Sequence, residues 1–223
     1  MFYDDPRKHG LKFNPFKAIV APRPIGWIST IDTDGNNNLA PYSFFNAMAD
    51  APPIVCFAAN NPGIEKPRKD TLTNIEQTNC FVVNMCSYEL REQMNVSSAH
   101  FAADIDDFEA AGLTAVASNK VKAPRVAEAP MSLECEFMFR LRLPSTHPKI
   151  ENNVVFGRVV GIHIADELIV DGRIDMGRYR PLARLGYMDY TSVESVFSMD
   201  RPDDNIELFE KRQRSRAAER AAE

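Results

Sequence analysis

The chain has 223 residues and is 44% hydrophobic, 26% charged and 9% aromatic, which is an ordinary globular composition with enough sequence for a sizeable core. The net charge of −5 excludes extensive disorder, and the excess of acidic residues together with the lack of a basic stripe argues against nucleic-acid binding. No stretch is apolar enough to span a bilayer, and the N-terminus does not resemble a secretory signal. We therefore expect a cytoplasmic protein that binds neither membrane nor nucleic acid.

The first predicted element is a β-hairpin. Residues 24–33 are rich in β-branched and aromatic side chains and run into Asp34-Gly35-Asn36-Asn37-Asn38, which favours a turn because Gly and Asn tolerate positive φ. Residues 39–45 then resemble a return strand. This pairing would make the polar residues of the two strands neighbours.

Four further strands are predicted, at residues 54–59, 80–85, 133–143 and 154–164. The third has the longest alternation, which indicates one buried and one wetter face. The predicted buried set is Leu133, Cys135, Phe137, Phe139, Leu141 and Leu143, and the wetter set is Glu134, Glu136, Met138, Arg140 and Arg142. Gly157 and Gly161 are expected to mark bends or close backbone approach in the last strand, and long bent strands favour a closed or partly closed barrel.

Short helices are predicted at residues 70–77, 88–96 and 106–111. The fold class is therefore mainly β with short helices (α+β). Residues 1–200 are expected to form one domain. Residues 201–223 are charged and contain good helix formers, so we expect a helical tail anchored at its start, or alternatively an arm that packs on a partner subunit.

The cysteines give no sign of a metal site. No two of them form a C-x-x-C pair, and three lie in apolar, strand-like stretches. The four are Cys56, Cys80, Cys86 and Cys135. We expect reduced thiols packed as small hydrophobic side chains, and no bound metal.

Three segments are polar where a purely structural element would not be. Residues 27–30 and 43–46 flank the predicted hairpin turn, and residues 69–71 stand at a predicted helix start. Their hydroxyl, amide and ammonium groups, together with the unpaired N–H groups of a helix start, suit a phosphate. Trp27, Phe44 and Phe45 add flat apolar surface. The pattern points to a nucleotide-like cofactor, and ordinary strand packing is the alternative.

The same segments resemble the flavin reductase-like family. Its successive signature segments are similar to PRPIGWIST at residues 22–30, NLAPYSFFN at 38–46 and KDTLTNI at 69–75. The family's C-terminal segment resembles PLARLG at residues 181–186, and the similarity extends from about Phe16 to Tyr190. It implies an FMN-binding split β-barrel of the flavoredoxin type, and a homodimer with FMN at or near the subunit interface.

The resemblance also implies the cofactor-binding residues. They are Trp27, Ser29 and Thr30 from the first strand; Ser43, Phe44, Phe45 and Asn46 after the turn; Lys69, Asp70 and Thr71 at the phosphate or ribityl end; and Arg184 from the C-terminal segment. For Trp27 the alternative is a core role with its indole N–H bonded internally. Phe44 and Phe45 should face opposite ways, one into the core and one towards the flavin ring.

The implied activity is that of an FMN-dependent oxidoreductase of flavin reductase type, which takes hydride from NADH or NADPH and passes electrons to a second acceptor. No side chain is expected to act as acid or nucleophile, because the flavin carries the redox chemistry. Some members that reduce free flavin have Gly-Asp-His ahead of the last long strand, where this chain has Ile150-Glu151-Asn152-Asn153. Two alternatives therefore stay open: an FMN-binding electron-transfer or sensor protein without NAD(P)H turnover, and a barrel that has lost FMN and serves as an interaction module.

Overall fold

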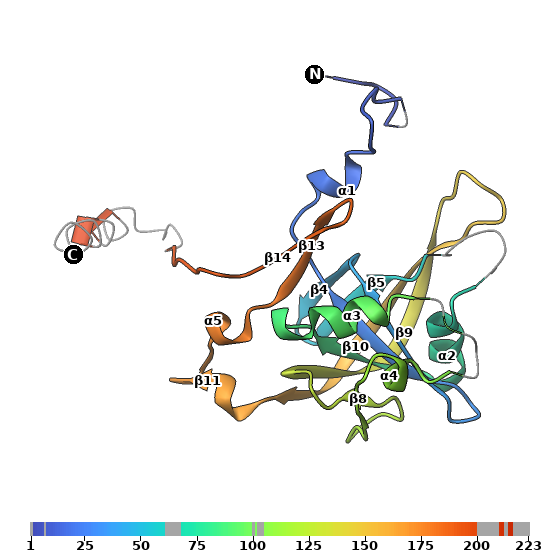
Figure 1. Ribbon diagram of the computed structural model, residues 1–223, viewed down its shortest axis with the longest axis vertical. Coiled ribbons are helices and arrows are strands. Elements are labelled where there is room, and N and C mark those ends of the chain that lie inside the picture. Colours follow the sequence, from blue (N-terminus) through green and yellow to red (C-terminus); the bar gives the residue numbers. More distant parts are fainter. Residues whose placement is uncertain are drawn as a thin grey trace.

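A seven-stranded antiparallel sheet forms the body of the protein (Figure 1). The computed structural model describes residues 2–6, 8–60, 68–99, 101, 105–199, 210–211 and 214–215. The sheet order is β3 (Asn37–Tyr42), β2 (Gly26–Ile31), β6 (Cys80–Met85), β9 (Met131–Leu143), β10 (Asn152–Ile164), β5 (Pro53–Ala58) and β4 (Phe45–Asp50). The predicted strands at 54–59 and 80–85 are confirmed by β5 and β6.

The sheet curls into a barrel because its two edge strands are consecutive in the chain. Only Ser43 and Phe44 connect β3 to β4, so these edges come close together. At the junction the ring of Phe45 packs on Gly26, where an added Cβ would lie only 2.7 Å from it. Inward-facing side chains of all seven strands and of α2 (Asp70–Thr78) fill the interior. The predicted barrel, mainly β with short helices, is confirmed.

The hairpin prediction is correct for β2 and β3 but wrong beyond Tyr42. Residues 37–42 pair with 26–31, whereas Phe45 begins a separate strand that pairs with β5. Pairing cannot continue because the chain before Gly26 leaves the barrel: Arg23 and Pro24 form β1 and pair with a different sheet. Residues 43–46 are therefore not the cross-strand neighbours of residues 27–30.

The ribbon formed by β9 and β10 extends past the barrel (Figure 1). Strand β6 pairs only with residues 131–136 of β9, and β5 only with residues 154–158 of β10. As a result Phe139, Leu141 and Leu143, predicted to be buried, are 50%, 50% and 40% exposed. The predicted bends at Gly157 and Gly161 are confirmed, since the register of β10 against β9 shifts at both glycines.

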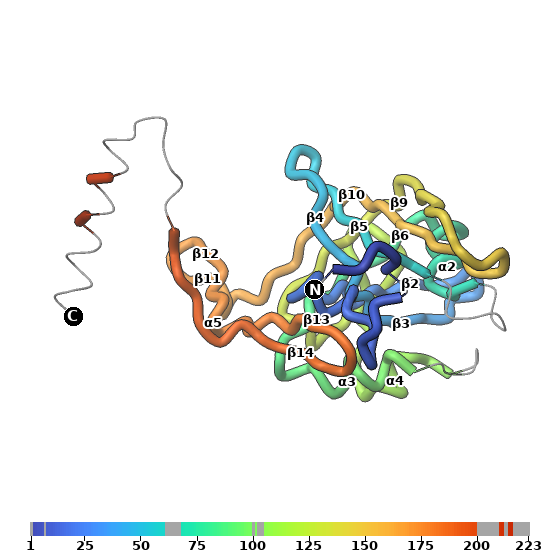
Figure 2. The backbone as a smooth tube through the Cα atoms, turned by 90° about the horizontal axis from the view of Figure 1, so that it is seen from above, coloured from blue at the N-terminus to red at the C-terminus, as the bar shows by residue number. Residues whose placement is uncertain are grey.

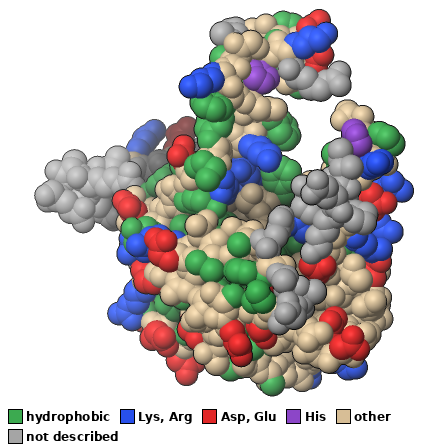
Figure 3. Space-filling view, turned by 45° about the vertical axis from the view of Figure 1, so that its right-hand side comes forward, with side chains coloured by type: hydrophobic (Ala, Val, Ile, Leu, Met, Phe, Trp, Pro, Cys, Tyr) green, Lys and Arg blue, Asp and Glu red, His purple; other side chains and the backbone are tan. Residues whose placement is uncertain are grey.

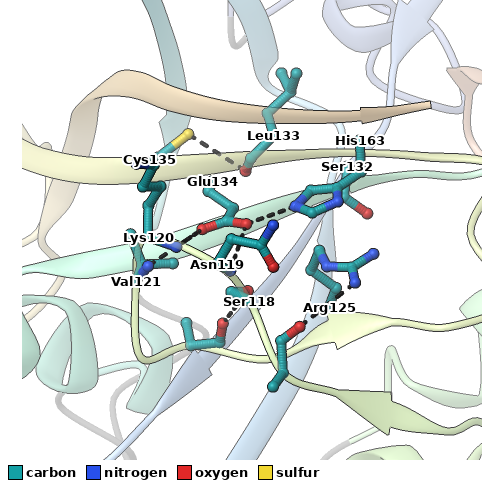
Figure 4. Close-up of polar contacts among 12 residues, drawn as sticks. Ser118, Asn119, Lys120, Val121, Arg125, Ser132, Leu133, Glu134, Cys135 and His163 are labelled. Atoms are coloured by element: carbon teal, nitrogen blue, oxygen red, sulfur yellow. Dashed lines mark hydrogen bonds and ion pairs between the residues drawn. The ribbon is translucent and has the colours of Figure 1, made fainter.

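Glu134 corrects the prediction of a wetter face on β9, because its side chain is completely buried. Figure 4 shows its carboxylate pointing towards the segment 118–121. It accepts backbone N–H bonds from Asn119, Lys120 and Val121 at 2.8, 2.6 and 3.1 Å, and its Oε1 lies 2.5 Å from Nε2 of His163. The alternation in the sequence could not show that a distant loop would fold back over this residue.

Short helices and a two-stranded sheet cover the outer face near β2 and β3. The helices are η1 (Tyr88–Leu90), α3 (Arg91–Val96) and α4 (Asp107–Ala110), and the strands are β7 (Ala115–Val116) and β8 (Arg125–Val126). Trp27 and Leu39, both fully buried, pack beneath them in a second core. Helix α2 corresponds to the predicted 70–77, and η1 with α3 to the predicted 88–96.

A small second sheet stands beside the barrel. It contains β1 (Arg23–Pro24), β13 (Leu182–Gly186) and β14 (Asp189–Ser192), and α1 (Phe16–Ile19) of the N-terminal arm, residues 8–22, packs on β13. The connection to it carries η2 (Asp166–Leu168), β11 (Ile169–Val170), β12 (Arg173–Ile174) and α5 (Met176–Tyr179). Figure 2 shows this connection extending sideways from the barrel.

Only residues 210–211 and 214–215 of the predicted tail are described, and their backbone is helical. The rest of the prediction for residues 201–223 lies outside the described residues. Within the described part, no helix is both long and apolar enough to cross a membrane.

Candidate functional site

A pocket of about 210 Å³ runs along the edge of β3. One wall is the start of α2, and the other is the segment after α3. The lining residues are Asp32, Asn36, Asn37, Asn38, Leu39, Ala40, Pro41, Lys69, Asp70, Thr71, Asn74, Ser97, Ser98, Ala99, Phe101, Ile105 and Asp107. The predicted Lys69, Asp70 and Thr71 thus lie together in one pocket.

Lys69 is an unusual residue to precede a helix. It is the N-cap of α2 and makes no side-chain capping bond, whereas helices favour an oxygen-bearing side chain there. A cation at this end also lies against the positive pole of the helix dipole. Lys69 therefore does not stabilise α2 by itself. Its ammonium would, however, attract an anion bound at the start of the helix.

Asparagine amides hold the start of α2 against the barrel. The Asn38 amide donates to the hydroxyls of Thr71 at 3.0 Å and Thr30 at 3.3 Å, and the Asn74 amide donates to Thr30 at 3.1 Å. Thr30 is fully buried, so it stands behind the pocket wall and positions the residues in front of it. Sequence reasoning missed Asn38 as a site residue because it belongs to the Gly-Asn cluster, which was interpreted as a turn.

The exposed edge of β3 is fixed from the other side by α4. The backbone N–H of Leu39 donates to the carboxylate of Asp107 at 2.8 Å. The Asn37 amide donates to Asp106 at 3.0 Å, and Asp106 also caps α4 through the N–H of Phe108. In these contacts, acidic side chains accept hydrogen bonds from donors on β3, an edge strand that has no neighbouring strand on this side.

Trp27 and Ser29 are fully buried and do not line the pocket. The indole N–H of Trp27 donates to Oγ of Ser97 at 2.8 Å, and the Ser29 hydroxyl donates to the carbonyl of Pro124 at 2.5 Å. The core role weighed for Trp27, with its N–H bonded internally, is the one that the structure shows. Trp27 reaches the pocket only through Ser97, which lines it.

The segment from Ser43 to Asn46 follows the pocket along the chain without lining it. Phe45 is buried and Phe44 is 38% exposed, so the two rings face opposite ways as predicted. Asn46 is exposed, and its side-chain oxygen accepts the N–H of Ala47 at 2.9 Å. Ser43 is half-buried in the bend between the two edge strands.

Arg184 also lies outside the pocket, on β13 opposite Arg23 of β1. Its guanidinium donates to the hydroxyl of Tyr190 and to the carbonyl of Tyr187. Of the predicted residues, the structure therefore brings Lys69, Asp70 and Thr71 together in the pocket, buries residues 27, 29 and 30 behind it, and places residues 43–46 and Arg184 outside it.

The electrostatics of the pocket keep Tyr42 neutral. Its ring lies 5.6 Å from the Lys69 ammonium. Burial, followed by the charges of Asp70 and Asp107, raises the pKa of Tyr42, although contact with the Thr71 hydroxyl acts in the opposite direction. The phenol therefore remains protonated near the pocket at neutral pH.

No disulfide joins the four cysteines, which are free thiols. Burial raises the pKa of Cys86 to about 12, and it also raises the pKa of Cys135, so neither is a thiolate at neutral pH. Among the residues that the structure describes, no group of His, Cys, Asp and Glu is arranged to hold a metal ion.

Comparison with known proteins points to one family. Residues 20–183 match the family described as flavin reductase like domain. A protein of Aquifex aeolicus is 40% identical over 177 residues, which is 79% of this chain and 87% of that protein.

Two solved structures are similar over most of their length. Nitrilotriacetate monooxygenase component B from Bacillus cereus is 28% identical with a TM-score of 0.80, covering 89% of this chain and all of that chain (100%). A Shewanella frigidimarina protein described as having a split barrel domain is 22% identical with a TM-score of 0.76, covering 90% of this chain and 99% of that one. The second likeness shows the fold alone.

Proposed function

The chain belongs to the flavin reductase-like domain family, and from this premise we propose that it binds FMN and passes electrons from NADH or NADPH to a second acceptor. The observation that carries the proposal is Lys69, a cation at the N-cap of α2 that lines the pocket beside the Thr71 hydroxyl. A helix start with a cation and a hydroxyl is a set of donors for a phosphate dianion.

The residues present fit FMN as a chemical group. Its phosphate needs charged and N–H donors, which Lys69 and the start of α2 supply. Its ribityl hydroxyls need hydrogen-bond acceptors, and the pocket offers the hydroxyl oxygens of Thr71 and Ser98, whereas the Ser97 hydroxyl is buried and already bonded to Met94 and Trp27. Its flat ring needs a strand edge and apolar surface, which β3 provides through Ala40 and Pro41.

The protein's own part is to bind and position the cofactor. When bound, FMN supplies the redox chemistry, accepting hydride from a nicotinamide and releasing electrons to the acceptor. Lys69 and Thr71 would hold the phosphate; the Asn38 amide bonds to both Thr71 and Thr30, and the Asn74 amide bonds to Thr30 behind them. The carboxylate of Asp107 fixes the strand edge at Leu39, so the binding groove keeps its shape.

The name of the Bacillus cereus relative marks it as one component of a monooxygenase. We propose that this chain supplies electrons to a second acceptor, and that it works in the cytoplasm. A homodimer with FMN at or near the subunit interface is part of the proposal. It is supported by the exposed apolar side chains of Phe139, Leu141 and Leu143, since monomers seldom expose a contiguous apolar patch.

One observation favours a second candidate, an FMN-binding electron-transfer or sensor protein without NAD(P)H turnover. The segment where some flavin-reducing relatives carry Gly-Asp-His is bonded here to two arginines of β9. Glu151 lies 3.4 Å from Arg142, and the side chain of Asn153 accepts a 2.7 Å bond from Arg140. No histidine stands there to meet a nicotinamide.

Steady-state NAD(P)H oxidation separates the two candidates. The purified protein loaded with FMN is supplied with NADH or NADPH and with a flavin, ferric or quinone acceptor. Turnover with at least one combination supports the reductase. Bound FMN that dithionite reduces while neither nicotinamide does so supports the second candidate.

A further inference from the structure

The hydroxyl of Tyr42 is a buried polar group without a hydrogen-bond partner. Tyr42 is the last residue of β3 and is 6% exposed, with its ring packed against that of Phe57 at a centroid distance of 4.8 Å. Within the part of the chain that the structure describes, its hydroxyl forms no hydrogen bond. Burying a hydroxyl without a partner is unfavourable, and phenylalanine would fill the same space without that cost.

The Thr71 hydroxyl is a polar neighbour of this phenol. The two groups are not hydrogen-bonded, but their contact acts on the pKa of Tyr42. Oγ1 of Thr71 accepts the Asn38 amide at 3.0 Å, and the Thr71 hydroxyl donates no bond to any residue that the structure describes. Because a hydroxyl oxygen can accept two bonds, Thr71 has one acceptor site and one proton left to use.

These two hydroxyls lie at the start of α2, where an acceptor for their protons is missing. Thr71 lines the pocket together with Lys69, whose ammonium lies 5.6 Å from the Tyr42 ring. Helix α2 has nine residues, and the first N–H groups of a helix have no acceptor within the helix. A ligand oxygen with negative charge would complete this set of donors.

Charge alone does not make this pocket attractive to a phosphate. The chain has a net charge of −5, and Figure 3 shows acidic side chains over much of the lower body on the face that it displays. Among the described residues that line the pocket, Lys69 is the one basic side chain, whereas three are acidic: Asp32, Asp70 and Asp107. Neutral donors therefore have to supply part of the attraction.

We propose that Tyr42 positions the Thr71 hydroxyl for the phosphate of FMN: the phenol donates to Oγ1 of Thr71, and the Thr71 hydroxyl donates to a phosphate oxygen. This inference rests on the proposed FMN binding and adds a residue that lies behind the pocket wall. Each bond in such a chain polarises the next one. The Ser98 hydroxyl oxygen then serves the ribityl group. Phosphate binding thus satisfies a buried group that folding leaves unsatisfied.

The test compares Y42F with Y179F, using FMN, riboflavin and inorganic phosphate as ligands. Tyr179, on α5, is the matched control because it is 4% exposed and packs in a separate core cluster with Met131 and Leu168. Y42F should bind FMN and inorganic phosphate about three- to tenfold more weakly, because one hydrogen bond of the chain is lost. Riboflavin has no phosphate, so Y42F should bind it as the wild type does. Y179F should bind all three ligands as the wild type does.

Urea unfolding without ligand separates this role from a structural one. Y42F should unfold at the same urea concentration as the wild type or at a higher one, since the hydroxyl that it removes has no partner. A lower midpoint together with equal losses of FMN and riboflavin affinity would refute the proposal by making Tyr42 a packing residue.

A double-mutant cycle tests the route through Thr71. In a T71V background the chain of hydroxyls is already broken, so adding Y42F should change the Kd for FMN by less than about twofold. Fully additive losses in Y42F/T71V would show that Tyr42 acts by another route and would refute the proposal.

The outcomes also distinguish this inference from the FMN proposal. If the wild type binds no flavin but binds inorganic phosphate more tightly than Y42F does, the FMN proposal fails and the role of Tyr42 stands. If the wild type binds FMN and Y42F binds it equally tightly, the role of Tyr42 is refuted and the FMN proposal is unaffected.

Discussion

Replacing Glu134 by Gln should destabilise the fold strongly although the residue lies outside the pocket. The carboxylate is completely buried and accepts three backbone N–H bonds from residues 119–121. In the E134Q variant one oxygen becomes an NH2 group that faces donors, so charge-assisted bonds are lost and buried donors are left unsatisfied. Each such loss costs about 1.5–3 kcal/mol, and together they should lower the free energy of unfolding by about 3–5 kcal/mol.

The pH dependence of this effect has a defined sign. Burial alone raises the pKa of Glu134, but the N–H bond from Asn119, the contact with His163 and the N–H bonds from Lys120 and Val121 outweigh it, so the net pKa lies below its ordinary value of 4.5. A carboxyl whose pKa is lowered on folding stabilises the protein at pH values above its pKa in the unfolded state. This contribution is lost as the pH falls through its pKa in the folded state. The difference between wild type and E134Q should therefore shrink below about pH 4.

Urea unfolding at pH 7 and at a series of acid pH values measures this difference. Glu136 provides the control, since its side chain is 51% exposed and pairs with Arg158 on the surface. E136Q should change the stability by less than about 1 kcal/mol. Equal losses for E134Q and E136Q, or a difference that persists unchanged in acid, would refute the role given to the buried carboxylate.

Three further predictions concern the site and its supports. The K69A variant, which leaves the bond between Asn38 and Thr71 intact, should keep its fold and bind FMN at least about tenfold more weakly, because a charged phosphate contact is lost; an unchanged fluorescence titration would place the phosphate elsewhere. G186A should loosen the N-terminal arm, because the new Cβ would lie 2.8 Å from Cα of Ala18; limited proteolysis of the arm should accelerate. W27F should lower the stability by about 1–3 kcal/mol through the lost bond to Ser97 and the cavity left behind; an unchanged urea midpoint would contradict this.

Local sequence signals predicted those elements whose pairing partners are near in the chain or whose composition is strongly apolar. The strand at 80–85 has its predicted bounds because five of its six residues are apolar and suited to a buried strand. The turn after β2 and the start of α2 were predictable because Gly, Asn and Asp have preferences of their own, although Asn37 and Asn38, predicted as turn, already belong to β3. The glycines at 157 and 161 marked the bulges for the same reason.

Long-range contacts decided what the sequence could not show. Glu134 is buried by residues 119–121, and Phe139 is exposed because no third strand accompanies the ribbon there. The polar segment at 27–30 resembled a binding surface, yet Trp27 lies inside the second core and Ser29 is fully buried. Hydroxyl groups bonded internally and hydroxyl groups facing a ligand look the same in a sequence, since only the covering loops distinguish them.

The visible spectrum of the purified protein, recorded anaerobically before and after addition of NADH or NADPH, tests the central claim most directly. The account predicts a flavin spectrum, from FMN that co-purifies or is taken up when added, which bleaches when one of the nicotinamides is mixed in. A protein that shows no flavin absorbance and takes up no added FMN would contradict it.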